Sequence, residues 1–163
     1  MASDRQTGKR IYTIGHSNHT PEEMIALLRR HGVTTVVDVR SAPYSKWASQ
    51  FNKGELGFAL SGAGIGYRYS GKELGGMPES EDLHTAGKPD YDKIAAQPEF
   101  DRELRDVVNS AGEADTCLLC SEGDPMLCHR ERLLARVLRS WGVDVAHILP
   151  DGELQRQEQG SLF

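Results

Sequence analysis

Apolar, strand-like runs alternate with helical patterns along most of this chain, and that alternation restricts the possible folds more than any other feature. The run at 33–39 is rich in β-branched residues and stays apolar on both faces until Asp38. Such a strand is typical of a parallel sheet covered by helices on both sides. Strand-like runs occur at residues 11–14, 33–39, 65–69, 116–120 and 143–149. The sequence therefore predicts an α/β fold: a single domain with a mostly parallel five-stranded sheet flanked by helices, in a Rossmann-like three-layer arrangement.

Helical patterns lie between these runs. Thr20, Pro21 and Glu23 predict a helix start, because a threonine cap, a proline in the first position and a glutamate three residues after the cap favour one. Further helices are predicted around residues 53–63, 98–111 and 129–141. Residues 71–89 are rich in Gly, Pro and acidic residues, so we predict a long loop there.

Length and composition exclude several classes of protein. The 163 residues suit one domain, predicted at 1–150, followed by a polar tail at 151–163. Apolar runs are too short to cross a membrane, and the start lacks a secretory pattern, so we expect a cytoplasmic protein with no membrane partner. Three cysteines are an odd set and indicate free thiols. The net charge of −5 argues against charge-driven coating of DNA.

Polar residues follow four of the predicted strands. Because the carboxyl ends of parallel strands share one edge, these residues are predicted to line one crevice, where ligands bind in such folds. Loop residues that merely satisfy backbone groups are the alternative for any single member, but four strand ends together favour a site. The residues are His16, Ser17 and Asn18; Asp38 and Arg40; Tyr69 and Glu73, the latter before Gly75 and Gly76; and Cys120 and Glu122.

The segment from Cys120 to Arg130, CSEGDPMLCHR, leaves a strand and enters a helix near Cys128. The free N–H groups of a helix start favour an anion. Helix periodicity places Arg130 on the buried stripe, where it would project under the crevice toward a carboxylate or phosphate. An internal salt bridge between Arg130 and Asp38 or Glu122 is the equal alternative.

Four residues are candidates for catalysis. Cys120 would act as nucleophile, since the helix start and Arg130 both lower a thiol pKa, or it would only pack or contact a ligand. Glu122, His129 or His16 would handle protons. Cys117, in mid-strand, is predicted to be a packing residue. A metal site of His16, Cys120, Cys128 and His129 lacks the close-pair spacing of structural zinc sites, so no metal is predicted, and no cofactor is identified.

Several motifs together resemble the bacterial and archaeal family catalogued as domain of unknown function 488. They are TIGHSNHTPEE, VVDVRSAPYS, QFNK, ELGG and LLCSEGDPMLCHR, and the resemblance runs from about Tyr12 to Ile148. It implies a single-domain α/β fold and a site built from these motifs, but no reaction. The positions that match are His16, Ser17, Asn18, Asp38, Arg40, Asn52, Glu73, Gly75, Gly76, Cys120, Glu122, Cys128, His129 and Arg130.

The end of the chain, Gln159-Gly160-Ser161-Leu162-Phe163, resembles the pentapeptide with which bacterial repair proteins bind the sliding clamp. Gln159, Leu162 and Phe163 would be the partner-binding residues, unless the tail folds back on its own domain. Residues 40–53 carry three basic residues and three aromatic ones without acids, a pattern that can bind single-stranded nucleic acid or simply cover an edge.

Two functions fit these features. The first is an enzyme with an anion- or phosphate-binding crevice that acts on a phosphorylated or nucleotide-like small molecule. The second is a non-catalytic nucleotide- or nucleic-acid-binding accessory of DNA repair, brought to the sliding clamp by its tail. A structural module with a polar crevice is the remaining alternative.

Overall fold

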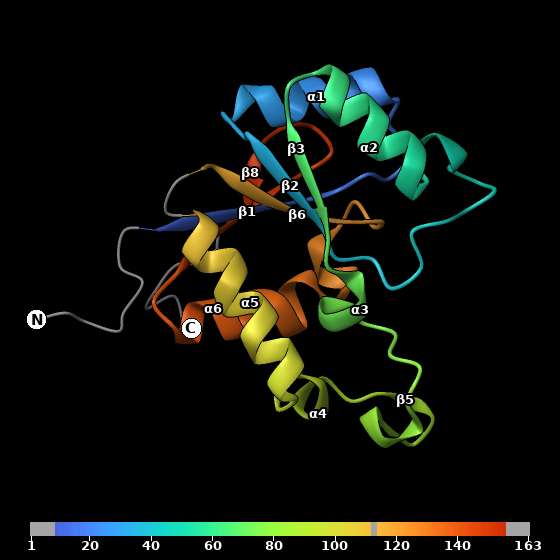
Figure 1. The fold of residues 1–163 in the computed structure, drawn as a ribbon, viewed down its shortest axis with the longest axis vertical. Coiled ribbons are helices and arrows are strands. Elements are labelled where there is room, and N and C mark those ends of the chain that lie inside the picture. Colours follow the sequence, from blue (N-terminus) through green and yellow to red (C-terminus); the bar gives the residue numbers. More distant parts are fainter. Residues whose placement is uncertain (1–8, 112–113, 156–163) are drawn as a thin grey trace, which may run out of the picture.

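One six-stranded sheet, in the order β3-β2-β6-β1-β7-β8, forms the centre of the molecule (Figure 1). The computed structural model describes residues 9–111 and 114–155. All of the strands are parallel except β8, which pairs antiparallel with β7. The strands are β1 (Arg10–Gly15), β2 (Thr35–Asp38), β3 (Gly66–Tyr69), β6 (Thr116–Cys120), β7 (Asp144–Ile148) and β8 (Leu154–Gln155). The predicted α/β class and mostly parallel sheet are thus confirmed.

Helices cover both faces of this sheet (Figure 1). The longer ones are α1 (Pro21–Arg30), α2 (Lys53–Gly62) and α5 (Pro98–Ala111), and a π-helical segment η4 (Arg130–Ala135) continues into α6 (Arg136–Ser140). The shorter ones are α3 (Gly71–Leu74), α4 (Tyr91–Ala95) and the 3-10 turns η1 (Ser49–Phe51), η2 (Glu81–Leu83) and η3 (Pro125–Leu127). Within the described ranges, no helix has the length and apolar character needed to cross a membrane.

Alternation along the strands divides the core into two layers. Val36 packs on one face with Leu28 of α1 and Leu60 of α2. Its neighbour Val37 packs on the other face with Leu104 of α5 and residues of η4. Successive side chains of a strand point to opposite faces, so strands that are apolar on both faces require helices on both. The predicted three-layer arrangement is therefore present.

The first helix begins as the sequence predicts. The Thr20 hydroxyl accepts a hydrogen bond from the Glu23 amide at 3.1 Å, and the Glu23 carboxylate accepts one from the Thr20 amide at 2.8 Å. This capping box satisfies two N–H groups that a helix start otherwise leaves unpaired. Local sequence thus determines where α1 begins.

Two predictions about the fold are wrong in detail. The sheet has a sixth strand, β8, which is only two residues long and lies in the segment predicted to be a polar tail. Residues 71–89 are not one loop: they contain α3, η2 and a hairpin of β4 (His84–Thr85) and β5 (Lys88–Pro89). Strands of two residues carry no readable periodicity, which is why the sequence did not indicate them.

Candidate functional site

The carboxyl end of β6 lies where the chain leaves neighbouring strands toward opposite faces. Strand β6 sits between β1 and β2, which lead into α1 and α2 on one face of the sheet. Strand β6 itself leads into η4 and α6 on the other face. The connections diverge at this point, and in open parallel sheets that divergence creates the crevice in which ligands bind. The His16 amide donates to the Cys120 carbonyl at 2.9 Å, which keeps the ends of β1 and β6 together.

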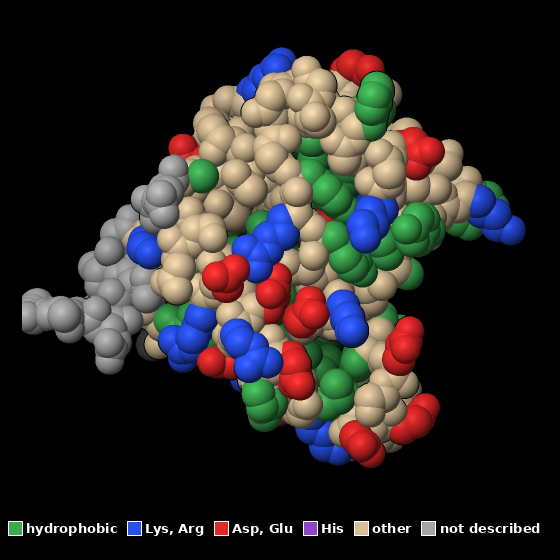
Figure 2. Space-filling view, viewed as in Figure 1, with side chains coloured by type: hydrophobic (Ala, Val, Ile, Leu, Met, Phe, Trp, Pro, Cys, Tyr) green, Lys and Arg blue, Asp and Glu red, His purple; other side chains and the backbone are tan. Residues whose placement is uncertain are grey.

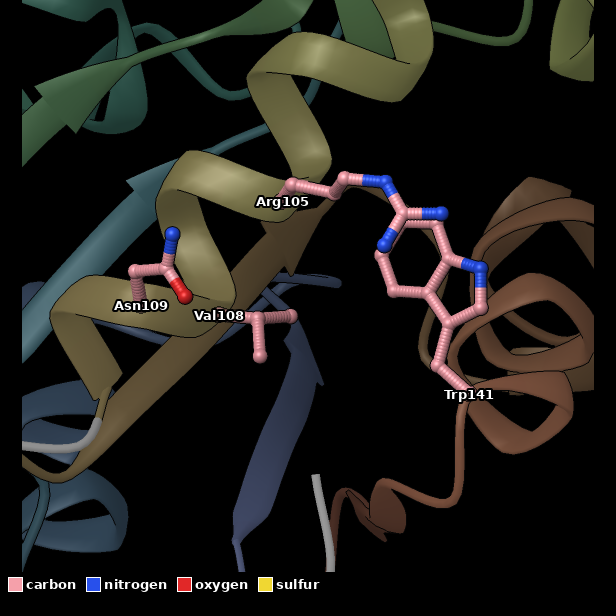
Figure 3. A pocket seen from close by; sticks show the side chains of 4 residues that line it. All are labelled: Arg105, Val108, Asn109 and Trp141. Carbon is pink, nitrogen blue, oxygen red and sulfur yellow. The ribbon is translucent and has the colours of Figure 1, made fainter. Parts of the chain in front are cut away.

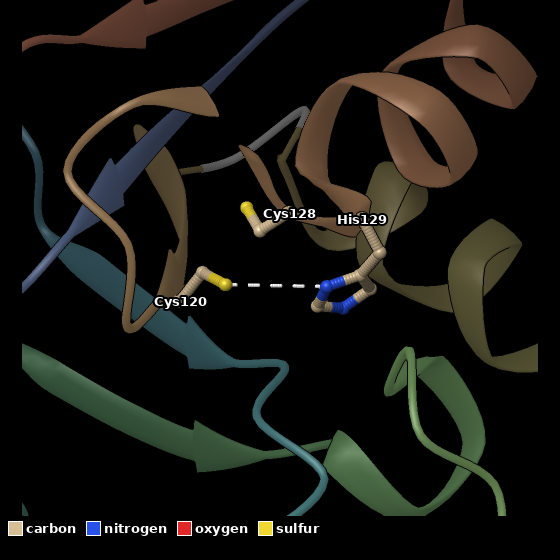
Figure 4. Close-up of side chains that lie close together, drawn as sticks. All are labelled: Cys120, Cys128 and His129. Atoms are coloured by element: carbon tan, nitrogen blue, oxygen red, sulfur yellow. Dashed lines mark hydrogen bonds between the residues drawn. The ribbon is translucent and has the colours of Figure 1, made fainter. Parts of the chain in front are cut away.

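Two cysteines and a histidine converge at this end of β6 (Figure 4). Cys120 is the last residue of β6, Cys128 follows η3, and His129 directly precedes η4. The two Sγ atoms and Nδ1 of His129 all lie within 4.8 Å of one another. Cys120 Sγ is 3.9 Å from Nδ1 of His129. Cys120 and His129 are buried, whereas Cys128 is partly exposed. We call these three residues the cysteine cluster.

The tautomer of His129 follows from its backbone partner. Its Nε2 lies 3.2 Å from the Val39 carbonyl, which can only accept a hydrogen bond. In the neutral ring Nε2 therefore carries the proton, and the lone pair of Nδ1 faces Cys120. Gly76 packs against the same ring, because a Cβ at Gly76 would lie 2.8 Å from Cγ of His129. The second glycine of the ELGG motif thus leaves room for the histidine.

Arg130 lies beneath the cluster and is fully buried, as helix periodicity predicts. Its Nη2 donates to the backbone carbonyls of Glu122 at 2.8 Å and Gly123 at 3.0 Å. Its Nη1 donates to Thr13 Oγ1 at 3.1 Å. Its Nε donates to Cys128 Sγ at 3.3 Å, and so does its amide at 3.4 Å. The guanidinium therefore holds the loop between β6 and η3 in place.

The internal salt bridge of Arg130, one of two alternatives that the sequence left open, is not formed within the described residues. Within residues 9–111 and 114–155 it has no carboxylate partner, and it contacts Glu122 through the backbone only. A buried guanidinium remains charged and needs a compensating anion. Among its hydrogen-bond partners, only Cys128 can ionise to an anion.

The surroundings shift the pKa values of the two cluster cysteines in opposite directions. A hydrogen bond from the Cys120 thiol, with the neighbouring His129 and Arg130, lowers the pKa of Cys128 far below the usual range, although burial opposes this. The hydrogen bond to Cys128, together with burial, raises the pKa of Cys120. Burial also raises the pKa of Cys117. The contact with Arg130 and the burial of Cys120 thus favour the thiolate at Cys128 and the neutral thiol at Cys120.

Asp38 and Arg40, both predicted to bind a ligand, bind each other. Arg40 donates from Nε to Asp38 Oδ1 at 2.9 Å and from Nη2 to Oδ2 at 2.8 Å, and both side chains are buried. The Tyr67 hydroxyl also donates to Asp38 Oδ2, at 2.6 Å. Burial and this hydrogen bond to an anion raise the pKa of Tyr67. The ion pair is thereby closed on itself and supports the end of β2.

The other predicted residues have mainly local contacts. His16 stacks on Phe51 with ring centroids 4.8 Å apart, and burial lowers its pKa. Asn52 accepts a hydrogen bond from the Ser45 amide at 2.7 Å and so shapes the segment after β2. Asn18 and Glu122 are exposed; Ser17, in the turn after β1, and Glu73, on α3, are partly exposed; and Gly75 packs on the Ser41 hydroxyl. Gln159, Leu162 and Phe163 lie outside the described residues.

A buried chain of hydrogen-bonded polar residues behind Arg130 was not predicted from the sequence. Thr13 Oγ1 lies 2.6 Å from Nδ1 of His147, and Nε2 of His147 lies 2.8 Å from a Glu131 carboxylate oxygen. Arg139 pairs with the other oxygen of Glu131 at 2.6 Å. Burial opposes ionisation of Glu131, yet the hydrogen bonds from His147 and Arg139 lower its pKa to about 2. A histidine inside the apolar run at 143–149 was the sequence signal for this chain.

Two hollows lie elsewhere on the surface. One, of about 440 Å³, is beside the loop after β6 and is lined by Gly123, Asp124, Leu149, Pro150, Asp151 and Gln155. The other, of about 110 Å³, is lined by Arg105, Val108, Asn109 and Trp141 (Figure 3). There the Arg105 guanidinium lies 4.2 Å above the Trp141 ring. None of the predicted site residues lines either hollow.

The cysteine cluster is also the group in the described part of the chain whose ligand atoms are close enough for one metal ion. His16, which the sequence associated with such a site, is not in this group. A divalent ion with two thiolates is neutral, so Arg130 would add an uncompensated positive charge in the interior. One thiolate, by contrast, neutralises Arg130. Charge therefore favours the thiolate–thiol pair over a metal centre.

Fold and site together define a parallel α/β protein with an arginine-paired cysteine at the carboxyl edge of a central strand. The family model described as domain of unknown function DUF488 matches residues 20–138, and the chain belongs to this family. The matched residues include the cysteine cluster and Arg130, which confirms the family that the motifs indicated. Comparisons with curated proteins and with solved structures gave no match.

Proposed function

We propose that this protein is an enzyme in which the thiolate of Cys128 attacks an electrophilic centre of a small substrate. The contact between Arg130 Nε and Cys128 Sγ, with no carboxylate at that guanidinium among the described residues, carries the proposal. A permanent buried cation next to a partly exposed thiol stabilises the nucleophilic form. The sequence offered Cys120 as the candidate nucleophile, with packing or a ligand contact as the alternative, but Cys120 is buried whereas Cys128 is partly exposed.

His129 and Cys120 support this nucleophile in different ways. Cys120 Sγ lies within 4.8 Å of the Cys128 sulfur, and its thiol donates to Nδ1 of His129 at 3.9 Å, which ties the histidine to the cluster. The lone pair of His129 Nδ1 faces Cys120 Sγ at 3.9 Å and lies within 4.8 Å of both sulfur atoms, so it can accept a proton from the cluster or from a substrate bound there. Arg130 acts as the counter-ion of the thiolate, because it is fully buried and three of its other four N–H groups bind Thr13 and two backbone carbonyls.

The surface after β2 and β3 supports a nucleotide-like or phosphorylated substrate. Tyr44 and Trp47 are exposed there, and Lys46 is exposed between them. Lys53 Nζ lies 4.4 Å above the Tyr69 ring. Figure 2 shows hydrophobic and basic side chains on the upper side of a hollow between the segment after β2 and the projection that carries β5, with acidic side chains on the lower side. Aromatic faces can stack on a base while the ammonium groups bind phosphate.

The pH dependence of alkylation tests the nucleophile. We expect Cys128 to react with iodoacetamide at a rate that is nearly constant from about pH 8 to about pH 5, where an ordinary thiol slows about tenfold per unit. The rate profile is compared because a low pKa also reduces the intrinsic nucleophilicity of a thiolate. Cys128→Ser should remove the pH-independent part of the alkylation rate. Cys117→Ser, in mid-strand, is the matched control and should retain it.

The groups that face Cys128 determine this profile. They are Cys120, His129, Arg130 and Tyr91 of α4. Of these, Arg130 retains its charge throughout the tested range, so the thiolate should persist. A profile for Cys128 that falls like that of a free thiol would refute the proposal.

The accessory function in DNA repair remains a prediction about the tail. It requires that removal of Leu162 and Phe163 abolish binding to the sliding clamp. Unchanged clamp binding by the truncated chain would contradict it. The enzyme proposal does not depend on this result.

A further inference from the structure

Cys120 lies where it can react with Cys128 after Cys128 has been oxidised. The two sulfur atoms are within 4.8 Å of each other. They belong to the two ends of one short loop, which η3 and the Arg130 contacts hold in place. An accessible, ionised cysteine with a second cysteine beside it is the arrangement found in peroxide-sensitive proteins. Cys117, the remaining cysteine, is fully buried in mid-strand.

His129 faces the second of these thiols. Its Nδ1 is 3.9 Å from Cys120 Sγ, and its Nε2 hydrogen is committed to the Val39 carbonyl. The Nδ1 lone pair can therefore accept the Cys120 proton when that thiol attacks. A buried thiol is otherwise a poor nucleophile, because burial keeps it protonated.

The geometry points to a further activity of this cluster: Cys128 and Cys120 form a dithiol pair that reduces a hydroperoxide and closes a disulfide. The inference rests on the Cys128 thiolate of the proposed function. In the first step, Cys128 Sγ attacks one peroxide oxygen and the O–O bond breaks. The sulfur becomes a sulfenic acid, and the departing oxygen takes a proton and leaves as water or an alcohol.

In the second step, Cys120 transfers its proton to Nδ1 of His129 and attacks the sulfenic sulfur of Cys128. The S–O bond breaks, and the departing hydroxide takes that proton from His129 and leaves as water. The two sulfurs have then lost two electrons, and the peroxide has gained them. An external dithiol is needed to return the pair to its reduced form.

Arg130 biases this pair toward the reduced form. Disulfide formation removes the thiolate and leaves the buried guanidinium with only neutral acceptors, Thr13 and two carbonyls. Stabilisation of the reduced state makes a disulfide more oxidising and easier to reduce. We therefore expect a small excess of dithiothreitol to reopen the bond fully.

Mass spectrometry of the full chain after treatment with hydrogen peroxide tests the inference. After alkylation of the remaining thiols, digestion at glutamate cuts after Glu122 and so separates Cys120 from Cys128 while Cys117 stays with Cys120. We expect the two peptides to remain joined unless dithiothreitol is added. In Cys120→Ser or Cys120→Ala, dimedone should instead label Cys128, and Cys117→Ser should behave like the wild type.

The outcomes separate this inference from the proposed function. Wild-type protein that shows the flat alkylation profile of Cys128 but forms no Cys120–Cys128 bridge overturns the dithiol pair alone. An ordinary alkylation profile overturns both. One equivalent of tightly bound zinc that prevents oxidation until a chelator removes it also overturns the inference, because both sulfurs would then be ligands.

Discussion

Arg130 donates its Nε hydrogen to Sγ of Cys128 at 3.3 Å, so a permanent buried cation meets an ionisable thiol. On its other side, Arg130 reaches Thr13, and through it His147 and Glu131. At each end of this chain, two groups of opposite charge are paired. Arg130 faces the Cys128 thiolate at one end, and Glu131 is paired with Arg139 at the other. Buried ions persist when they are paired in this way. The chain therefore ties the thiolate to the start of the last helix.

Removing the buried guanidinium should destroy the thiolate. In Arg130→Met we expect alkylation of Cys128 to slow steeply below about pH 8, and the free energy of unfolding to fall by roughly 3–5 kcal/mol. Arg130→Lys retains the positive charge but not the planar, multiply donating guanidinium. Its alkylation profile should lie between those of the wild type and Arg130→Met. Arg136→Met is the matched control, because the side-chain contacts of Arg136, with Asp92 and with the Arg132 carbonyl, are exposed. A flat alkylation profile in Arg130→Met would contradict the assigned counter-ion.

Glu131 should make the fold sensitive to acid. Its pKa is lowered to about 2, below that of an unfolded glutamate, so its contribution is complete above about pH 4.5 and is lost as the pH falls toward 2. Its side chain is 16% exposed, so screening is moderate and we expect about 2 kcal/mol. Urea unfolding at a series of pH values measures this. The difference between wild type and Glu131→Gln should shrink in acid, and a constant difference would refute the linkage.

Gly76 should be intolerant of a side chain. A Cβ there would lie 2.8 Å from Cγ and 2.9 Å from Cβ of His129, which is buried and bonded to Val39. We expect Gly76→Ala to lower the free energy of unfolding by roughly 1–3 kcal/mol. Gly54→Ala is the control, since nothing lies within 4 Å of its added Cβ, and it should stabilise α2 by up to about 1 kcal/mol. Equal effects of the two substitutions would show that His129 is not confined.

Periodicity and caps were enough to predict most of the fold. The β-branched run ending at Asp38 indicated a strand covered on both faces, and the Thr20–Glu23 box located the start of α1. The hairpin of β4 and β5 depends instead on a turn in which Ala86 and Gly87 both have positive φ, of 55° and 79°. Alanine gives no warning of that conformation, so the sequence could not indicate the turn.

The site was predictable in outline but not in its pairings. Helix phase correctly placed Arg130 in the interior. Its partners depend on tertiary structure, because Thr13 lies 117 residues away and two acceptors are backbone carbonyls of an irregular loop. The choice between Cys120 and Cys128 depends on the same loop, which turns Cys128 toward the guanidinium and buries Cys120. Residue type and spacing carry no information on that orientation.

Removing one member of the Asp38–Arg40 ion pair should destabilise the fold much more than replacing both members by apolar residues. Asp38→Asn leaves Arg40 buried without its anion, so we expect a loss of roughly 3–5 kcal/mol in the free energy of unfolding. Tyr67→Phe removes one hydrogen bond to the carboxylate and should cost roughly 1.5–3 kcal/mol. The double substitution Asp38→Leu with Arg40→Met should recover most of the loss, because apolar residues of similar size can replace a buried pair.

Chemical unfolding of the single and double variants measures this coupling. If Asp38→Leu with Arg40→Met is as unstable as the sum of its single substitutions, the two side chains act independently, which their two hydrogen bonds of 2.9 and 2.8 Å contradict. Recovery in the double variant together with an unchanged alkylation profile of Cys128 would assign the pair to the support of β2. If stability recovers but the flat alkylation profile of Cys128 is lost, Arg40 contributes to the electrostatic potential at the cysteine cluster. Arg40 already acts electrostatically on neighbouring His16.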